Sequence, residues 1–185
     1  MPREVPGLES ELRRQHTLLQ MMAERMREAA TLWDDSGGAR GPRLRRALEV
    51  HRKFLIEVHQ ADEDKVLTAL RAVGPPEAAA VAERCSQEHP RALKFAATAA
   101  ALLGQLGSGR AADVRALPAL FREEAERIER HHLFDEESLY AHLDAWLTGA
   151  ARIRLARDIR GRDAARADAE GALIAWVAQL HPASD

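Results

Sequence analysis

Two stretches of the chain, HQADEDKVLTAL at residues 59–70 and HLFDEESLYAHL at residues 132–143, share the pattern that decides the fold. In each, a histidine is followed four residues later by a glutamate: His59 with Glu63, and His132 with Glu136. Four residues advance an α-helix by about 400°, so both side chains of a pair project from one face. Each stretch is expected to be a helix that presents an imidazole and a carboxylate side by side.

The helix faces that carry these pairs are otherwise apolar. A buried carboxylate without a cation is costly, and it either finds a cation or takes up a proton. No lysine or arginine lies on these faces within one turn of either glutamate, so a metal ion is the simplest compensation. The alternative is an exposed polar pair, which the apolar flanks disfavour. The expected inward positions are Leu48, Leu55, Val66, Leu67, Leu70, Phe121, Ile128, Leu139, Leu143 and Leu147.

Two further histidines complete an internal repeat. His16 precedes His59 by 43 residues, and His89 precedes His132 by the same interval. Taken singly, such histidines would be ordinary satisfied residues of a helix, but the repeated spacing predicts two related helical hairpins about a pseudo-twofold axis. Each hairpin would supply two imidazoles and one carboxylate to a pair of metal ions. The predicted ligands are His16, His59, Glu63, His89, His132 and Glu136.

Several neighbouring residues leave alternatives open. His131 could replace His132, with Asp135 as its partner four residues on, although the repeat aligns His131 with Val58 and favours His132. Asp62 and Asp135 could each hold an imidazole N–H, or be solvated. Tyr140 could donate a hydrogen bond to a bound ligand, but packing at a bundle end is favoured. Cys85 is expected to be buried or partly buried, and surface or bundle-end positions are expected for His51, His142 and His181.

Helical periodicity runs through most of the chain, and Gly/Pro clusters divide it. A serine cap at Ser86 would place Pro90 in the first turn of the third long helix, where its missing N–H is harmless. We expect an all-α, antiparallel up-down four-helix bundle over residues 1–149 and a C-terminal helical extension over residues 150–185 that packs on it. The expected helices are Leu8–Trp33, Arg43–Val73, Glu77–Cys85, a third long helix ending near Gly104, Pro118–Leu147, and a tail broken near Gly161.

Composition agrees with this fold class and excludes several functions. The 185 residues suffice for one domain, and the chain is rich in Ala, Leu, Arg and Glu, which favour helix. A formal charge of -2 gives no reason to expect nucleic acid or an anionic membrane as a partner. The single cysteine excludes an internal disulfide, and no stretch approaches the ~20 apolar residues of a membrane span. We expect a soluble, cytoplasmic protein of bacterial type; a homodimer stays open.

The pattern H…HxxxE…H…HxxxE resembles the hemerythrin-like, or HHE cation-binding, family. It stands here as His16, His59 with Glu63, His89, and His132 with Glu136, and the resemblance covers roughly residues 8–147. Oxygen-carrying hemerythrins have a further histidine one turn after the third-helix ligand, where this chain has Leu93. The sequence is more similar to the four-His, two-Glu di-iron members, so reversible oxygen transport is not expected.

This resemblance implies two iron ions bridged by carboxylates and an oxo or hydroxo group, with zinc or manganese as substitutes. It also implies a small ligand, O2, peroxide or NO, and a role in oxidative or nitrosative stress defence. The alternative is an iron- or oxygen-sensing module without turnover.

Overall fold

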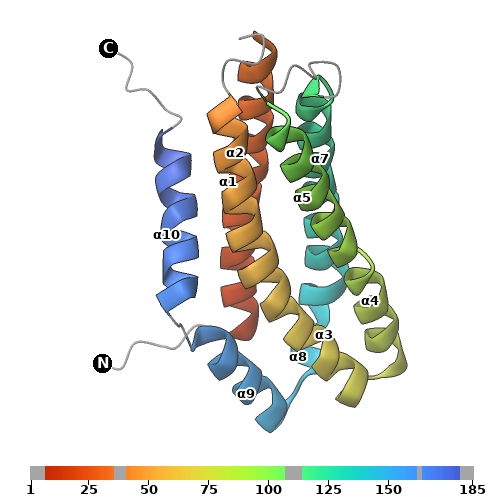
Figure 1. Ribbon diagram of the computed structural model, residues 1–185. Helices are drawn as coiled ribbons and strands as arrows, with labels where there is room; N and C mark the ends of the chain where they lie inside the picture. The colour runs from red at the N-terminus through yellow and green to blue at the C-terminus, as the bar shows by residue number, and fades with distance from the viewer. Residues whose placement is uncertain (1–6, 36–40, 107–113, 162–163, 180–185) are drawn as a thin grey trace.

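The computed structural model describes residues 7–35, 41–106, 114–161 and 164–179, and it is helical through almost all of them (Figure 1). No strand occurs in these ranges. The expectation of an all-α protein is therefore confirmed. In the same ranges, no helix is both long enough and apolar enough to cross a bilayer.

Four long helical segments lie side by side and form a helical bundle (Figure 1). α1 contacts α7 and α2, while α5 contacts α7, α2 and η1, so the segments enclose a shared interior. The segment bounds lie within about three residues of those expected from periodicity. The four segments are α1 (Leu8–Asp35); α2 (Gly41–Val50), η1 (His51–Gln60) and α3 (Ala61–Val73) in unbroken succession; α5 (His89–Gly104); and α7 (Leu117–Phe134), η2 (Asp135–Leu139), η3 (Tyr140–His142) and α8 (Leu143–Trp146).

The second and fourth segments each contain a π-helical stretch at the positions of interest. The stretch η1 includes His59, and η2 begins at Asp135 and includes Glu136. A π-helix closes its turns with i→i+5 bonds, is rare, and occurs frequently at functional sites. Because it widens the turn, it also alters which face of the helix the following residues occupy.

The connection between the second and third segments contains the short helix α4 (Pro76–Ser86). Gly74 ends α3 with its N–H bonded to Leu70 O at 2.9 Å, and Pro76 lies in the first turn of α4. The expectation that Ser86 caps the next helix was wrong: its hydroxyl donates to Glu83 O, and it remains the last residue of α4. Glu88 occupies the cap position of α5 instead, and Pro90 lies in the first turn as expected.

The apolar interior consists of two clusters of buried side chains. One includes Leu19, Leu55 and Ile128, and the other includes Leu12, Val66 and Leu139. On α1, on η1–α3 and on α7–η2, the predicted metal ligands lie in sequence between a member of one cluster and a member of the other. The polar site is therefore enclosed by apolar layers on both sides.

The C-terminal helices α9 (Gly149–Arg160) and α10 (Ala164–Gln179) complete these clusters. α9 contacts α1 and α3, and its Ile159 joins the cluster of Leu12. α10 contacts α1, η1 and α2, and buries Leu173 and Trp176 in the cluster of Leu19. The tail thus packs on the bundle; the domain boundary at residue 149 stays a prediction.

Candidate metal centre

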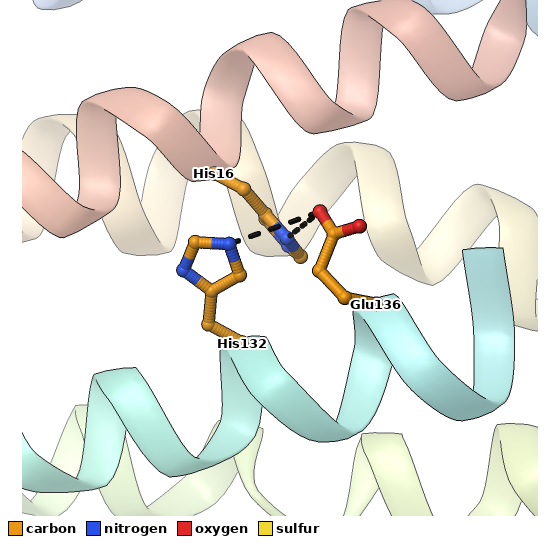
Figure 2. A group of neighbouring side chains, drawn as sticks. All are labelled: His16, His132 and Glu136. Atoms are coloured by element: carbon orange, nitrogen blue, oxygen red, sulfur yellow. Dashed lines mark hydrogen bonds and ion pairs between the residues drawn. The ribbon is translucent and has the colours of Figure 1, made fainter. Parts of the chain in front are cut away.

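His16, His132 and Glu136 form one group of potential metal ligands (Figure 2). His16 projects from α1 toward the fourth segment, where His132 and Glu136 lie one turn apart. Glu136 Oε1 is 3.1 Å from His16 Nδ1 and 3.8 Å from His132 Nε2. The other carboxylate oxygen of Glu136 is paired with the Arg13 guanidinium. This group is partly open to solvent, because His132 and Glu136 are only half-buried.

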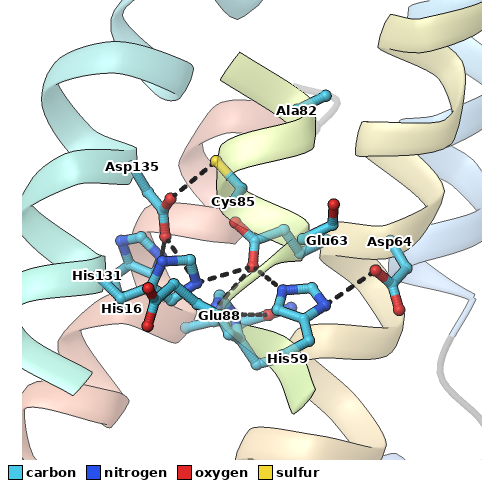
Figure 3. A network of polar contacts seen from close by, with 12 residues as sticks. His16, His59, Glu63, Asp64, Ala82, Cys85, Glu88, His131 and Asp135 are labelled. Atoms are coloured by element: carbon cyan, nitrogen blue, oxygen red, sulfur yellow. Dashed lines mark hydrogen bonds and ion pairs between the residues drawn. The ribbon is translucent and has the colours of Figure 1, made fainter. Parts of the chain in front are cut away.

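Glu63 is the centre of a second group that is fully enclosed (Figure 3). Its Oε2 lies 3.1 Å from His89 Nε2, 3.5 Å from His131 Nε2 and 3.6 Å from His59 Nε2. All four side chains are buried, and the Glu63 carboxylate is inaccessible to solvent. Three helical segments therefore direct imidazole nitrogens at one carboxylate oxygen.

Asp135 joins the two groups. Its Oδ2 is 3.4 Å from His131 Nε2 and 3.8 Å from His16 Nε2, and its Oδ1 accepts a hydrogen bond from the Cys85 thiol at 3.3 Å. Figure 3 shows the resulting continuous network from Cys85 through Asp135 to Glu63. The two groups thus form one polar cluster rather than two separate sites.

All six residues predicted as ligands lie within this cluster, and the structure adds His131 and Asp135 to it. The latter pair has the same four-residue spacing as His132 and Glu136, displaced by one position. The internal repeat favours His132 and Glu136, but His131 and Asp135 are the more deeply buried pair. Leu93, where oxygen carriers have a further histidine, is 55% exposed and contributes nothing to the cluster.

Several inward-facing atoms of the cluster have no hydrogen-bond partner. In the described part of the chain these include His59 Nε2, Glu63 Oε1, His131 Nε2 and Asp135 Oδ2, all buried. A buried polar atom without a partner costs about 1–3 kcal/mol, and more when the group is charged. Imidazole nitrogens and carboxylate oxygens are also the donor atoms that transition metals bind. The residues therefore fit a bound metal, which would satisfy these atoms together.

Burial favours the neutral imidazole at His16 and His59, whereas at His89 burial is outweighed by the Glu63 and Asp64 carboxylates, which raise its pKa. Burial lowers the pKa of His59 to about 4 and lowers that of His16 still further. Burial acts to raise the pKa of Glu63, but the His131 and His89 imidazoles outweigh it and hold that pKa well below the usual range. Burial and the Glu63 charge raise the pKa of Asp135 well above its usual value. Metal ligands must be deprotonated, so binding through Asp135 would release a proton.

Two histidines are oriented from behind by polar side chains. Gln15 Oε1 lies 3.1 Å from His59 Nδ1, and the Gln15 amide donates to Asp62 at 2.9 Å. His89 Nδ1 is 2.9 Å from Asp64 Oδ1. When His59 Nδ1 donates to Gln15, His59 Nε2 is left as the lone-pair nitrogen facing the cluster. His89 contacts carboxylates through both ring nitrogens, since its Nε2 donates to Glu63 Oε2, so metal binding at Nε2 would release that proton. Such partners fix both the tautomer and the ring orientation of metal-binding histidines.

The remaining expectations have mixed outcomes. Asp62 is buried, so it is not a solvated acid, but it accepts from the Gln15 amide and not from an imidazole N–H. Cys85 and Tyr140 are buried, and the Tyr140 hydroxyl lies 2.9 Å from His16 Nε2, so it touches the cluster. His142 is exposed as expected, whereas the expectation for His51 was wrong, because it is fully buried against Glu124. His181 lies outside the described residues.

Comparisons of the chain with protein-family models, curated proteins and solved structures give no match. The geometry of the cluster and the spacing of its residues therefore carry the functional argument.

Proposed function

We propose that the four long segments form an antiparallel up-down four-helix bundle that holds a dinuclear iron centre, as in hemerythrin-like proteins. The supporting observation is the set of buried atoms without hydrogen-bond partners on His59, Glu63, His131 and Asp135. These atoms come from two helical segments, are surrounded by further imidazoles, and include carboxylate oxygens. A protein gains nothing from enclosing such a set without a cation, since every member would be better solvated by water.

The ligands would be His16, His59, Glu63 and His89, together with one His–carboxylate pair from the fourth segment. We assign that role to His131 and Asp135, because both are buried and both direct an atom without a hydrogen-bond partner into the cluster. Glu136 is already paired with Arg13. This assignment differs by one residue from that of the repeat, and single substitutions distinguish the two. His131→Gln should lower bound iron strongly, and His132→Gln should lower it less.

Iron in this donor set would supply a redox-active Lewis acid with an open position for O2, peroxide or NO. The chain's own contribution is to hold Glu63 ionised and the His16 and His59 imidazoles neutral, and to exclude bulk water with apolar layers on both sides. We therefore propose a protein that reacts with such a small ligand in oxidative or nitrosative stress defence.

Metal analysis of protein from iron-supplemented cells, combined with an optical spectrum, tests the centre. We expect about two irons per chain and near-ultraviolet bands of an oxo-bridged pair. Zinc alone, or no metal after iron supplementation, would overturn the proposal. Turnover of peroxide by the loaded protein, lost in Glu63→Ala, would then support the reactive function.

A specific contact favours sensing without turnover as a second candidate. Arg166 of α10 is paired with Asp62, which binds Gln15, and Gln15 in turn contacts His59. Metal occupancy could therefore affect the docking of the C-terminal helix through this chain of contacts. Limited proteolysis of α10, compared between metal-free and loaded protein, tests it. A large change in protection without peroxide turnover would favour sensing, and equal cleavage would exclude it.

A further inference from the structure

A second polar network, made by His51, Glu124 and Arg127, is buried in the apolar layer beside the metal cluster. His51 Nε2 lies 2.7 Å from Glu124 Oε1, and the His51 ring packs against Phe95 with centroids 4.8 Å apart. Arg127 donates to both Glu124 oxygens, from Nε and from Nη2, each at 2.8 Å. None of these three residues belongs to the proposed ligand set. A buried arginine in an apolar layer needs a reason beyond helix packing.

Arg127 also lines the cavity at the metal cluster. The cavity has a volume of about 10 Å³, close to the least that holds one water-sized species. Its polar walls are Arg127 and the cluster residues His16, His59, His131, His132 and Asp135. Arg127 precedes His131 by one helical turn, so both side chains lie on the same face of α7.

The Nη1 amino group of Arg127 is left without a hydrogen-bond acceptor. The two-point contact with Glu124 occupies Nε and Nη2, whereas Nη1 is buried and makes no hydrogen bond. The nearest further carboxylate, Glu88, is 3.7 Å away from Nη1, which is an ion-pair contact outside hydrogen-bond range. A guanidinium cannot lose its proton, so this donor persists at every physiological pH. The Glu124–His51 pair holds the guanidinium in place.

We propose that Arg127 is an anion-recognition residue of the metal centre, which donates from Nη1 to a monoanion of about the size of a water molecule. Glu124 and His51 act as positioning residues for it. The inference rests on the proposed function and deepens it, since it makes the site select anionic over neutral ligands. Hydrogen bonds in which a partner is charged are the stronger ones, and enclosure strengthens them further.

The test measures dissociation constants for iron-loaded protein by optical titration, with fluoride as a water-sized monoanion and NO as a neutral ligand. Arg127→Gln should weaken fluoride binding by about tenfold or more, and should leave NO binding within about twofold. Arg127→Lys, which keeps the charge but loses the planar donor set, should give an intermediate fluoride affinity. Arg130→Gln is the matched control, because Arg130 lies three residues on, at the surface, paired with Glu126.

Each outcome decides the matter. Unchanged fluoride affinity at full iron content overturns the inference, and so does an equal loss of fluoride and NO binding, which would indicate a merely structural role. Loss of iron from both Arg127 variants, with iron retained in the Arg130 control, likewise assigns Arg127 to site support and overturns it. Absence of iron from the unmodified protein overturns the proposed function itself, and this inference with it.

Discussion

Glu63→Gln should abolish most of the stabilisation that iron confers on the folded protein. Glu63 is fully buried, one oxygen contacts three imidazoles, and the other has no hydrogen-bond partner. Glutamine has nearly the same shape but carries no charge and offers one weak oxygen ligand. Loss of a partner behind a metal ligand costs 10–100-fold in affinity, so loss of the ligand charge itself should cost at least about 100-fold.

Mass action converts this loss into a melting temperature. At free ferrous iron of about 100 times the dissociation constant, binding stabilises the folded state by about 2.7 kcal/mol. For a chain of this length that corresponds to an increase in Tm of about 5–11 °C. A 100-fold weaker variant at the same iron concentration retains only about 0.4 kcal/mol, or about 1–2 °C.

The assay is anaerobic thermal unfolding of each protein at pH 7, with and without iron. Each variant is compared with its own metal-free form, so any effect of the substitution on metal-free stability cancels. Glu137→Gln is the matched control, since Glu137 is exposed and adjacent to the cluster residue Glu136. A folded Glu63→Gln protein that keeps half or more of the iron-dependent Tm increase would refute the assignment of Glu63 as a ligand.

Three further predictions use other features of the fold. Gln15→Leu should weaken iron affinity about 10–100-fold, because it removes the acceptor behind His59. The control is Gln20→Leu at an exposed position, and an iron affinity of Gln15→Leu equal to that of this control would contradict the prediction. Burial lowers the pKa of His51 in the folded protein. As the pH falls below about 6.5, His51 is therefore protonated in the unfolded chain before it is protonated in the folded one, and the free energy of unfolding decreases. His51→Gln should remove up to about 1.4 kcal/mol per pH unit of that decline in urea unfolding of metal-free protein between pH 5 and 6.5; an unchanged slope argues against it. Phe121→Ala should cost about 3–5 kcal/mol, since Phe121 is fully buried and packs edge-on against another ring; a loss below about 1 kcal/mol in urea unfolding would contradict that packing.

The helical segments could be predicted from the sequence because each signal is local. Apolar periodicity places the buried stripes, and the Gly74–Pro76 and Gly149 regions coincide with the segment ends. The cap of α5 was less predictable. Ser86 has the side chain of a good cap, but its hydroxyl is satisfied within α4, and the helix starts three residues later. Local propensity leaves such boundaries uncertain by a few residues.

Residues that act through distant contacts gave no comparable signal. Gln15 and Arg127 are a glutamine and an arginine on amphipathic helices, where a solvated position is the ordinary expectation. Gln15 acts on His59, which lies 44 residues away in the sequence. The role of Arg127 depends on the cavity at the metal cluster, which it lines. His51 was expected near the surface for the same reason, and only its partner Glu124 explains its burial.

The sequence by itself determined that a histidine and a glutamate recur at helical spacing in two stretches of the chain, because a four-residue interval repeats one face of a helix whatever surrounds it. It did not determine which of two adjacent pairs in the fourth segment faces the interior. A shift of one residue along an α-helix rotates the side chain by about 100° about the helix axis. The π-helical turn that begins at Asp135 further changes the direction in which the residues after it point. Tertiary packing decided the matter by burying His131 and Asp135 beside Glu63 and leaving His132 and Glu136 nearer the solvent.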